Sequence, residues 1–238
     1  CGGRTRSRTS GRSITAATAD GLFVVFEGVE GAGKSTHLEL LGRHLEERGV
    51  PHRIVREPGG TEAGERIRRV VLDAALEVTP RTELLLMLAA RAEFVDRLVR
   101  PALRRGEVVL ADRYEMSTFA YQGVARGIGL DRVRELNEFA TGGLKPDALV
   151  LLDVSAETGR RRKAGDAERD RMEREDEDFH RAVAGAYRRL AEEIPERLAS
   201  SSDGLIRVPA EDGRDEVHRR IRAALHRRWP ETFGPPAG

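Results

Sequence analysis

The residues most able to do chemistry form one short run near the start of the sequence. Residues 28–35, GVEGAGKS, match the pattern G-x-x-x-x-G-K-[ST]. The run follows an apolar stretch of strand length and precedes a stretch with helical spacing, which is the context that this pattern requires. Its glycines let backbone N–H groups converge on phosphate oxygens, and the helix N-terminus presents a positive dipole end. The run therefore predicts a phosphate-binding loop for a nucleoside triphosphate.

Side chains in and near this loop have predicted roles toward ATP and Mg²⁺. Lys34 would neutralise the β- and γ-phosphates, and the Ser35 hydroxyl is placed to ligate Mg²⁺. An acid at the end of a neighbouring strand completes such a metal environment, and Asp112, which closes the run EVVLAD, is the leading candidate. The predicted metal site is thus Ser35 and Asp112. The predicted ATP-binding residues are Gly28, Val29, Glu30, Gly31, Ala32, Gly33, Lys34, Ser35 and Thr36.

Arginines near the predicted strand ends could bind a second anion. Arg56, Arg91 and Arg113 each follow or lie within apolar elements, close to the edge where α/β sheets bind ligands. A lone arginine at such a place is more often part of a surface ion pair. Three of them in addition to Lys34 favour a second anion beside the first.

These residues must be positioned by alternating strands and helices. Apolar runs of strand length occur over residues 22–28, 52–57, 107–112, 147–154 and 204–210. Helical spacing appears over residues 33–48, around Ile67 and Val71, and over residues 83–104, where Pro101 would bend the last turn. Five strands alternating with helices predict an α/β fold, with a doubly wound, parallel, five-stranded sheet and helices on both faces.

Composition narrows the classes of protein and partner. Of 238 residues, 39% are apolar, which is enough for a core. No apolar run approaches the roughly 18 residues of a membrane-spanning helix. Lys and Arg number 41 against 40 Asp and Glu, which excludes the strongly basic surface of a dedicated nucleic-acid binder. The only cysteine is Cys1, so a disulfide framework is excluded and a reducing cytoplasm fits. The expected partners are small molecules, with no nucleic acid and no membrane.

One domain is expected over residues 21–230. Residues 1–20 carry four arginines against one aspartate and are interpreted as a disordered basic tail. Residues 231–238 are expected to form a flexible C-terminal tail. The segment 160–178 is almost entirely charged, so it is either a solvated helix laced with ion pairs or a mobile, arginine-bearing lid over an anionic ligand. Its charge alone favours the helix.

Four motifs, in this order and spacing, resemble the bacterial thymidylate kinases among the P-loop nucleoside monophosphate kinases. The motifs are FEGVEGAGKST (26–36), REPGGTEAGERIR (56–68), DRYEMSTFAYQG (112–123) and DRMERED (170–176). The resemblance extends from about Phe23 to Trp229. It implies a P-loop kinase architecture with a lid over about residues 160–175, and it changes the favoured interpretation of the charged segment from helix to lid.

The resemblance also implies a role for each matching position. Arg91 would contact the acceptor nucleotide, and Arg113 would contact its 5′-phosphate. The acceptor pocket would be bordered by Arg56 and the Glu57-Pro58 loop. The residues expected to face thymine and deoxyribose are Ser117, Thr118, Tyr121 and Gln122. The residues expected to act in catalysis are Lys34, Asp112, Arg113, Arg162 and Arg171, with Arg169 as a further lid arginine.

The chain departs from the family pattern at two places. Four residues before Arg91, related enzymes usually have a phenylalanine that stacks on thymine, whereas this chain has Met87. A thioether can lie against a ring, but it stacks less selectively. In the lid, Ala164 and Asp166 stand where arginines are expected. Met87 is nevertheless expected among the acceptor-binding residues.

These observations predict transfer of a phosphoryl group from ATP to dTMP, giving ADP and dTDP, with Mg²⁺. A phosphate monoester has a second pKa near 6, so the acceptor is already an anionic nucleophile and needs no general base. One alternative is a deoxynucleoside kinase, in which Glu57 or Glu30 would act as base. A second is a non-catalytic P-loop nucleotide-binding module. The resemblance further implies a homodimer, formed through the apolar helix 83–104 unless that apolar stripe is core.

Overall fold

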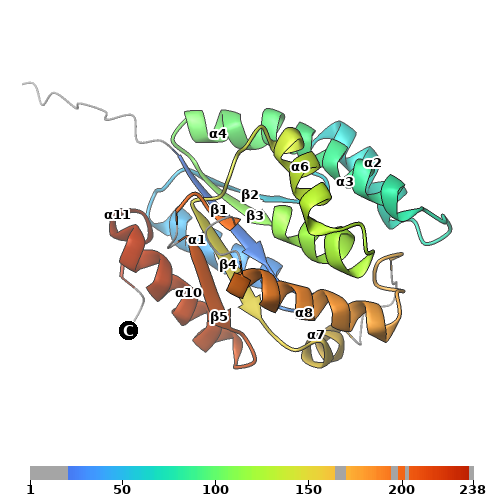
Figure 1. Cartoon of the computed structure of the whole chain (residues 1–238). Coiled ribbons are helices and arrows are strands. Elements are labelled where there is room, and N and C mark those ends of the chain that lie inside the picture. Colours follow the sequence, from blue (N-terminus) through green and yellow to red (C-terminus); the bar gives the residue numbers. More distant parts are fainter. Residues whose placement is uncertain (1–20, 164–169, 194–197, 202–203, 236–238) are drawn as a thin grey trace, which may run out of the picture.

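The computed structural model describes residues 21–163, 170–193, 198–201 and 204–235. The expected tail over residues 1–20 and part of the expected lid, including Arg169, lie outside the described residues. Within them, helices enclose a central sheet (Figure 1). The strands of this sheet are β1 (Leu22–Glu27), β2 (His52–Arg56), β3 (Val108–Asp112), β4 (Ala148–Asp153) and β5 (Leu205–Pro209).

The sheet has the order β2-β3-β1-β4-β5, and each neighbouring pair is parallel. Strand β1 is central, and its Val24 pairs with Leu110 of β3 on one side and Ala148 of β4 on the other. This arrangement confirms the predicted doubly wound sheet with the architecture of a P-loop kinase. Because all five strands run the same way, the loops after β1, β2 and β3 meet at one edge, where such sheets bind ligands.

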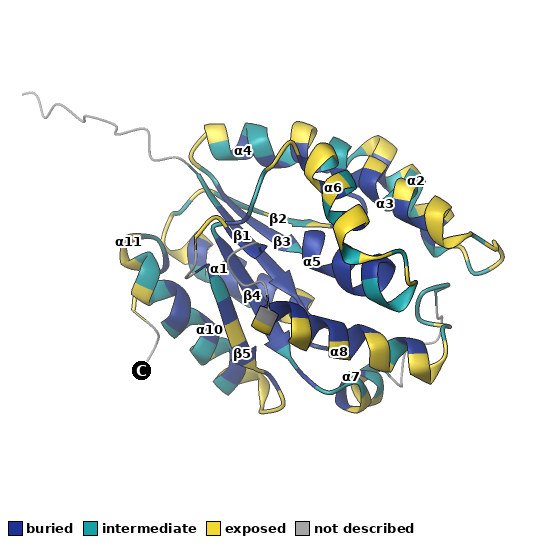
Figure 2. Ribbon diagram, viewed as in Figure 1, coloured by how far each residue is buried: buried dark blue, intermediate teal, exposed yellow. Residues whose placement is uncertain are grey.

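The alternating side chains of β1 pack against helices on both faces of the sheet. Phe23 and Val25 lie in one apolar cluster, and Val24 and Phe26 lie in another, all with no exposed surface. In Figure 2 the three central strands β1, β3 and β4 are accordingly buried, whereas the edge strands β2 and β5 carry exposed residues, as do the outer sides of the helices. Burial on both faces explains why the three central strands have continuous apolar sequences rather than alternating ones.

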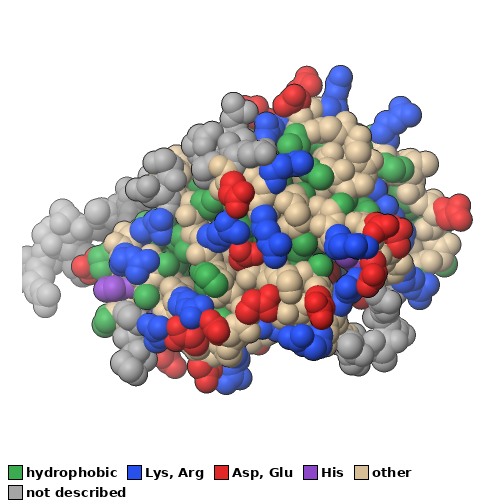
Figure 3. All heavy atoms as spheres, turned by 60° about the horizontal axis from the view of Figure 1, so that its bottom comes forward, with side chains coloured by type: hydrophobic (Ala, Val, Ile, Leu, Met, Phe, Trp, Pro, Cys, Tyr) green, Lys and Arg blue, Asp and Glu red, His purple; other side chains and the backbone are tan. Residues whose placement is uncertain are grey.

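Twelve helical segments are described around the sheet. They are α1 (Lys34–Glu47), α2 (Glu62–Leu72), α3 (Pro80–Phe94), η1 (Val95–Val99), α4 (Arg100–Arg104), α5 (Glu115–Thr118), η2 (Phe119–Ala125), α6 (Leu130–Thr141), α7 (Ala156–Lys163), α8 (Glu177–Glu193), α10 (Arg214–Arg228) and α11 (Pro230–Phe233). Among the described residues, no helix combines the length and the apolar character needed to cross a membrane. Basic and acidic side chains are interspersed over the face shown in Figure 3.

The long helix expected over residues 83–104 differs from the prediction at both ends. It begins earlier, at Pro80, because Thr79 accepts a hydrogen bond from the Thr82 N–H and proline suits the first helical turn. Its last part is not a bent α-helix. A π-helical turn, η1, precedes Pro101, which has no N–H to donate and would crowd the carbonyl four residues earlier in a regular helix.

The expected flexible tail after residue 230 was wrong for its first residues. Residues Pro230–Phe233 form α11, and the side chain of Phe233 is completely buried. The Arg48 guanidinium of α1 donates to the carbonyl oxygens of Glu231 and Thr232 at 2.9 and 3.1 Å. One aromatic anchor and these two hydrogen bonds therefore extend the packed fold to the end of α11.

Helix α7, which leads into the charged segment, touches the phosphate-binding loop backbone to backbone. A Cβ atom on Gly31 would lie 2.1 Å from the Gly159 carbonyl oxygen, and one on Gly159 would lie 2.3 Å from the Glu30 carbonyl oxygen. Neither position has room for a side chain. The base of the expected lid is thereby fixed against the loop by two glycines.

We expect Gly159→Ala to lower the free energy of unfolding by about 1–3 kcal/mol, because the methyl group would force two backbone segments apart. The matched control is Gly185→Ala on α8, where an added Cβ meets nothing within 4 Å. That change should be neutral or stabilising by up to about 1 kcal/mol. Urea unfolding of both variants measures this difference in the free energy of unfolding. If the two variants are equally stable, the contact between Gly159 and the phosphate-binding loop does have room for a methyl group.

Candidate functional site

The phosphate-binding loop places the Lys34 ammonium group inside its own curve. Gly28, Gly31 and Gly33 have φ values of 143°, 72° and 94°, which side chains rarely tolerate. The Lys34 Nζ donates to the carbonyl oxygens of Gly28 and Val29 at 3.1 and 3.0 Å. Burial, followed by the nearby Arg113, lowers the pKa of Lys34. The loop thus holds a cation that a phosphate group can approach from the open side.

Ser35 and Asp112 meet beside the loop, as their positions predicted. The Ser35 Oγ donates to the Asp112 carboxylate at 2.8 Å, which joins the first turn of α1 to the end of β3. Two oxygen ligands fit Mg²⁺, which keeps most of its coordination for water and phosphates. In the part of the chain that the structure describes, no group of three or more His, Cys, Asp or Glu residues could hold an ion by itself.

Arg113 lies at the centre of the site in an unusual backbone conformation. Its φ is 74°, in the left-handed region that costs a non-glycine residue of the order of 1 kcal/mol. The guanidinium pairs with Glu30 of the phosphate-binding loop and donates to Ser117 Oγ at 2.9 Å and Tyr187 OH at 3.1 Å. It also lies over the Tyr121 ring, 5.4 Å from the centroid. Contacts from four parts of the chain therefore direct one guanidinium into the site.

The buried carboxylate of Glu27 holds the turn that contains Arg113. It has no exposed surface and accepts from the Tyr114 N–H at 2.8 Å and from the Ser117 N–H at 3.1 Å. It also accepts from the hydroxyls of Ser117 and Tyr187 at 2.6 and 3.0 Å. Four donors satisfy the two carboxylate oxygens, so the end of β1 positions the start of α5.

Arg91 lies behind the wall of the site rather than in it. Only 1% of its surface is exposed. Its guanidinium donates to Glu57, Thr118 and Asn137 and to the Tyr114 carbonyl, all within 3.0 Å. These contacts use every N–H direction that a guanidinium offers. Arg91 thus fixes Glu57 and the start of α5, and its expected direct contact with an acceptor nucleotide stays a prediction.

A second buried carboxylate, Glu83 of α3, gathers cationic groups from two loops. Its oxygens accept from Arg171 at 2.7 Å, from Arg126 at 3.0 Å and from the Gln122 amide at 2.8 Å. Burial opposes ionisation, but hydrogen bonds from Arg126, Gln122 and Arg171 outweigh it and lower the pKa of Glu83. The guanidinium of Arg171 is occupied here and by the Val71 carbonyl oxygen. Its expected place among the catalytic residues stays a prediction.

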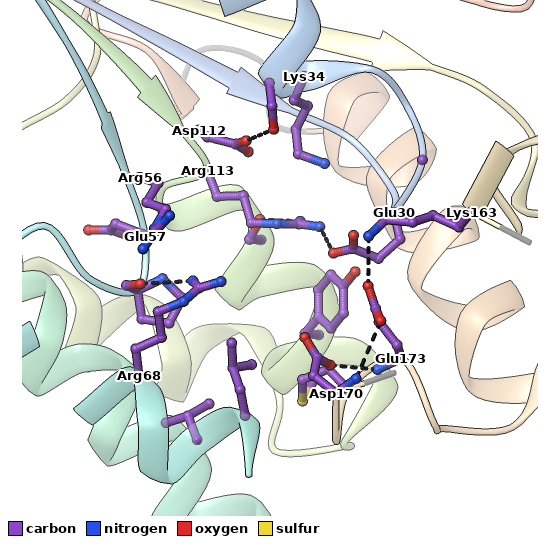
Figure 4. A pocket seen from close by; sticks show the side chains of 18 of the residues that line it. Glu30, Lys34, Arg56, Glu57, Arg68, Asp112, Arg113, Lys163, Asp170 and Glu173 are labelled. Carbon is purple, nitrogen blue, oxygen red and sulfur yellow. Dashed lines mark hydrogen bonds and ion pairs between the residues drawn. The ribbon is translucent and has the colours of Figure 1, made fainter. Parts of the chain in front are cut away.

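One cavity of about 670 Å³ joins the phosphate-binding loop to the second group of predicted residues. In Figure 4, Arg113 lies between Arg56, Glu57 and Arg68 on one side and Glu30, Lys163 and Glu173 on the other. The predicted residues that line the cavity are Glu30, Gly31, Gly33, Lys34, Ser35, Thr36, Arg56, Glu57, Pro58, Met87, Asp112, Arg113, Ser117, Tyr121, Gln122 and Arg162. The cavity therefore brings together most of the residues assigned separately to a donor and an acceptor.

The chain matches known proteins over most of its length. Residues 26–221 match the family model for thymidylate kinase. The chain is 44% identical over 205 residues to the thymidylate kinase of Caldanaerobacter subterraneus subsp. tengcongensis, covering 86% of this chain and 95% of that protein. It is 43% identical over 210 residues to that of Deinococcus radiodurans, covering 88% and 98%. The chain belongs to the thymidylate kinase family.

Some predicted residues of this family member support the cavity without lining it. The carbonyl groups of Gly28 and Val29 hold Lys34, and Ala32 packs in the core. Thr118 is completely buried and accepts from Arg91. Arg162, in contrast to these residues, lines the cavity, and its guanidinium donates to the Ala210 carbonyl oxygen at 2.9 Å.

Several residues of the site had no predicted role. Arg68 lies within the run REPGGTEAGERIR, lines the cavity and donates to the Pro58 carbonyl oxygen at 2.9 Å. Glu27 and Glu83 are buried carboxylates on a strand and a helix that face the core. Glu27 ends one apolar stretch of the sequence and Glu83 begins another. An acidic residue at such a place was the available sequence signal for a buried carboxylate. Tyr187 gave no such signal, because one tyrosine in an amphipathic helix resembles ordinary core.

The ion pair between Glu30 and Arg113 predicts that the protein becomes less stable at acidic pH. Arg113 lowers the pKa of Glu30 from 4.5 to about 2, although burial acts in the opposite direction. The folded state therefore favours the ionised carboxylate, so the stabilisation is present above pH 4.5 and is lost as the pH falls toward 2. Glu30→Gln should be less stable than the parent near neutral pH. This difference in the free energy of unfolding should shrink as the pH falls from 4.5 toward 2.

Chemical denaturation at several pH values measures this effect. Glu62→Gln is the matched control, because Glu62 pairs with Arg66 on an exposed helix surface, where ion pairs contribute little. The account of Glu30 is contradicted if its substitution produces the same small, pH-independent difference as the control.

Proposed function

We propose that the chain transfers the γ-phosphoryl group of ATP to the 5′-phosphate of dTMP, giving ADP and dTDP, with Mg²⁺ as the cation. One observation supports this most. The Arg113 guanidinium lies in the same cavity as Lys34, and the two helical segments that follow Arg113, α5 and η2, carry Ser117, Tyr121 and Gln122. A phosphate between these groups would have the donor loop on one side and the nucleoside pocket on the other.

Catalysis in this proposal depends on charge rather than on a general base. A nucleotide 5′-phosphate is an anionic nucleophile at neutral pH, so the main obstacle is its repulsion from the triphosphate. Lys34, Arg113 and Arg162 all line the cavity, and in this proposal Lys34 and Arg162 act on the donor phosphates and Arg113 on the acceptor phosphate. Ser35 and Asp112 would hold Mg²⁺, which supplies further positive charge when bound. Fixed cations of this kind stabilise the transition state by positioning and by electrostatics.

The acceptor end of the cavity suits a pyrimidine with an N3–H group. Gln122 is 2% exposed, and its side-chain oxygen Oε1 has no hydrogen-bond partner, although its amide nitrogen is bound to Glu83. A buried acceptor without a donor is unfavourable unless a ligand supplies one. Thymine N3–H is such a donor. Met87 and Tyr121 also line the cavity and would contact the ring.

The arrangement disfavours the two alternatives. A deoxynucleoside kinase needs a carboxylate base beside a neutral 5′-hydroxyl. Glu57 is bound to Arg91 at the cavity wall, and Arg113 lowers the pKa of Glu30 to about 2, which makes Glu30 a poor base at neutral pH. A non-catalytic nucleotide-binding module would have no use for the acceptor pocket that opens from the same cavity.

We also propose a homodimer through helices α3 and α6 and a cytoplasmic location. The inner side of α3 supplies Leu84, Leu88 and Phe94 to the core, whereas Leu85 on its outer side is 58% exposed. On α6, which packs against α3, Phe139 is 89% exposed. Large apolar side chains left exposed on neighbouring helices are typical of an interface. Sedimentation of the protein and of Phe139→Ser would test the dimer.

The proposed reaction is tested by coupled ADP release with dTMP, dUMP, dCMP, thymidine or no acceptor. We expect fast release with dTMP, slower release with dUMP, and background release with thymidine or no acceptor. Lys34→Ala should lower turnover with dTMP by about two orders of magnitude or more while the protein still folds, because the charge of Lys34 acts on phosphate. Thymidine turnover comparable with that of dTMP would overturn the proposed acceptor, and near-normal Lys34→Ala activity would overturn the donor site.

Met87 generates a separate prediction about the base. If its thioether lies against the pyrimidine, Met87→Phe should strengthen dTMP binding by up to about 1 kcal/mol through better stacking. Met87→Ala should weaken dTMP binding and affect ATP less, because Met87 lies at the acceptor end. Calorimetric titration of both nucleotides against the three proteins measures this. Unchanged dTMP affinity in both variants would mean that Met87 does not contact the base.

A further inference from the structure

The amide of Gln122 is held in one orientation by the residue behind it. Its nitrogen Nε2 donates to Glu83 Oε1 at 2.8 Å, its oxygen Oε1 is buried and has no hydrogen-bond partner, and the residue is one of those that line the cavity. An amide can in principle point either way, because its two ends have similar shapes. Only its hydrogen-bond partners decide which end faces a ligand.

As long as Glu83 is ionised, the Gln122 amide can adopt only one of its two orientations. An ionised carboxylate only accepts hydrogen bonds, so the NH₂ end of Gln122 must face Glu83 and the oxygen must face the cavity. Arg126 and Arg171 both donate to Glu83 Oε2, at 3.0 and 2.7 Å, and Arg126 also donates to Oε1 at 3.2 Å. These two cations stabilise the ionised form of a carboxylate that has no exposed surface.

We propose that Glu83 is a positioning residue that determines base specificity, because it fixes the Gln122 oxygen toward the acceptor pocket. The pocket then presents an acceptor and favours pyrimidines that carry an N3–H donor. Thymine and uracil have this donor, whereas cytosine has an unprotonated N3 that would face the Gln122 oxygen as a second acceptor. This inference rests on the proposed function, since it concerns which nucleoside monophosphate the enzyme accepts.

The variant Glu83→Gln should reverse the amide. Two arginines donate at the Oε2 position, so the oxygen of the new side chain would lie there, and its NH₂ group would take the Oε1 position and face Gln122, with loss of the longer contact from Arg126 Nε. Gln122 would then turn its oxygen inward and its NH₂ group toward the pocket, where cytosine N3 can accept. The matched control is Glu175→Gln, because Glu175 also pairs with Arg126 but has no contact with Gln122.

The test compares kcat/KM for dTMP, dUMP and dCMP in the wild type, Glu83→Gln and Glu175→Gln. In Glu83→Gln we expect the ratio of dTMP to dCMP to fall by roughly tenfold or more, since an unpaired buried group opposes the wrong base. The ratio of dTMP to dUMP should stay within about twofold, because both bases carry N3–H. Glu175→Gln should change neither ratio. A purely structural defect would lower all three activities together, and that result would overturn the inference.

Failure of the inference can be told apart from failure of the proposed function. If the wild type does not phosphorylate dTMP, the function itself is wrong. If it does, and Glu83→Gln keeps the wild-type ratio of dTMP to dCMP, only the role of Glu83 is wrong.

A measurement on the wild type covers the case in which Glu83→Gln does not fold. Gln122 is the only glutamine of the chain and Asn137 the only asparagine, so a ¹⁵N spectrum contains just two side-chain NH₂ pairs. We expect the Gln122 pair to exchange slowly with solvent both without nucleotide and with dTMP bound, because Glu83 holds it in both states. Exchange as fast as that of a free glutamine side chain would overturn the inference.

Discussion

The structure depends on keeping several buried cations beside one another at one edge of the sheet. Charged groups can be buried only when partners compensate for the lost solvation. Here three guanidinium groups each pair with a carboxylate: Arg113 with Glu30, Arg91 with Glu57, and Arg171 with Glu83, which also pairs with Arg126. Lys34 instead lies on two carbonyl groups of its own loop. The carboxylates that border the cavity are therefore as important to the proposed site as its cations.

These pairs also explain why distant elements meet where they do. The Arg91 pair joins α3 to the end of β2 and to α5, and the Arg113 pair joins the end of β3 to the phosphate-binding loop. The Glu83 cluster joins α3 to two other parts of the chain. These are the loop after η2, through Arg126, and the charged segment that contains Arg171. Because the donors of each guanidinium are directional, the pairs fix orientation as well as position. A rigid cavity of this kind is suited to aligning two anions for in-line transfer.

The sequence was most informative where the interactions are local. The phosphate-binding loop, the five strands and the predicted contact between Ser35 and Asp112 follow from short patterns and from the rule that parallel strands end at one edge. The placement of Arg91 could not be predicted in this way. Its partner Asn137 is 46 residues away, and only the packing of α3 against α6 brings the two together.

The contacts of Arg171 and the end of the fold also depend on long-range packing. Arg171 belongs to a charged run in which every arginine is equally plausible as a lid residue, and only the buried Glu83 distinguishes it. Phe233 packs into an apolar space beside α1 and α10, and this contact makes α11 part of the fold. Local sequence patterns do not reveal such a space. Buried carboxylates far apart in the sequence thus determined the parts of the site that were missed.

Calorimetric titration of dTMP and thymidine tests whether Arg113 binds the phosphate of the acceptor. Arg113→Gly is the suitable variant, because a φ of 74° is comfortable for glycine. The account predicts that the variant binds thymidine as the parent does but loses roughly tenfold or more of its affinity for dTMP. Equal losses for dTMP and thymidine, or an unchanged affinity for dTMP, would contradict it.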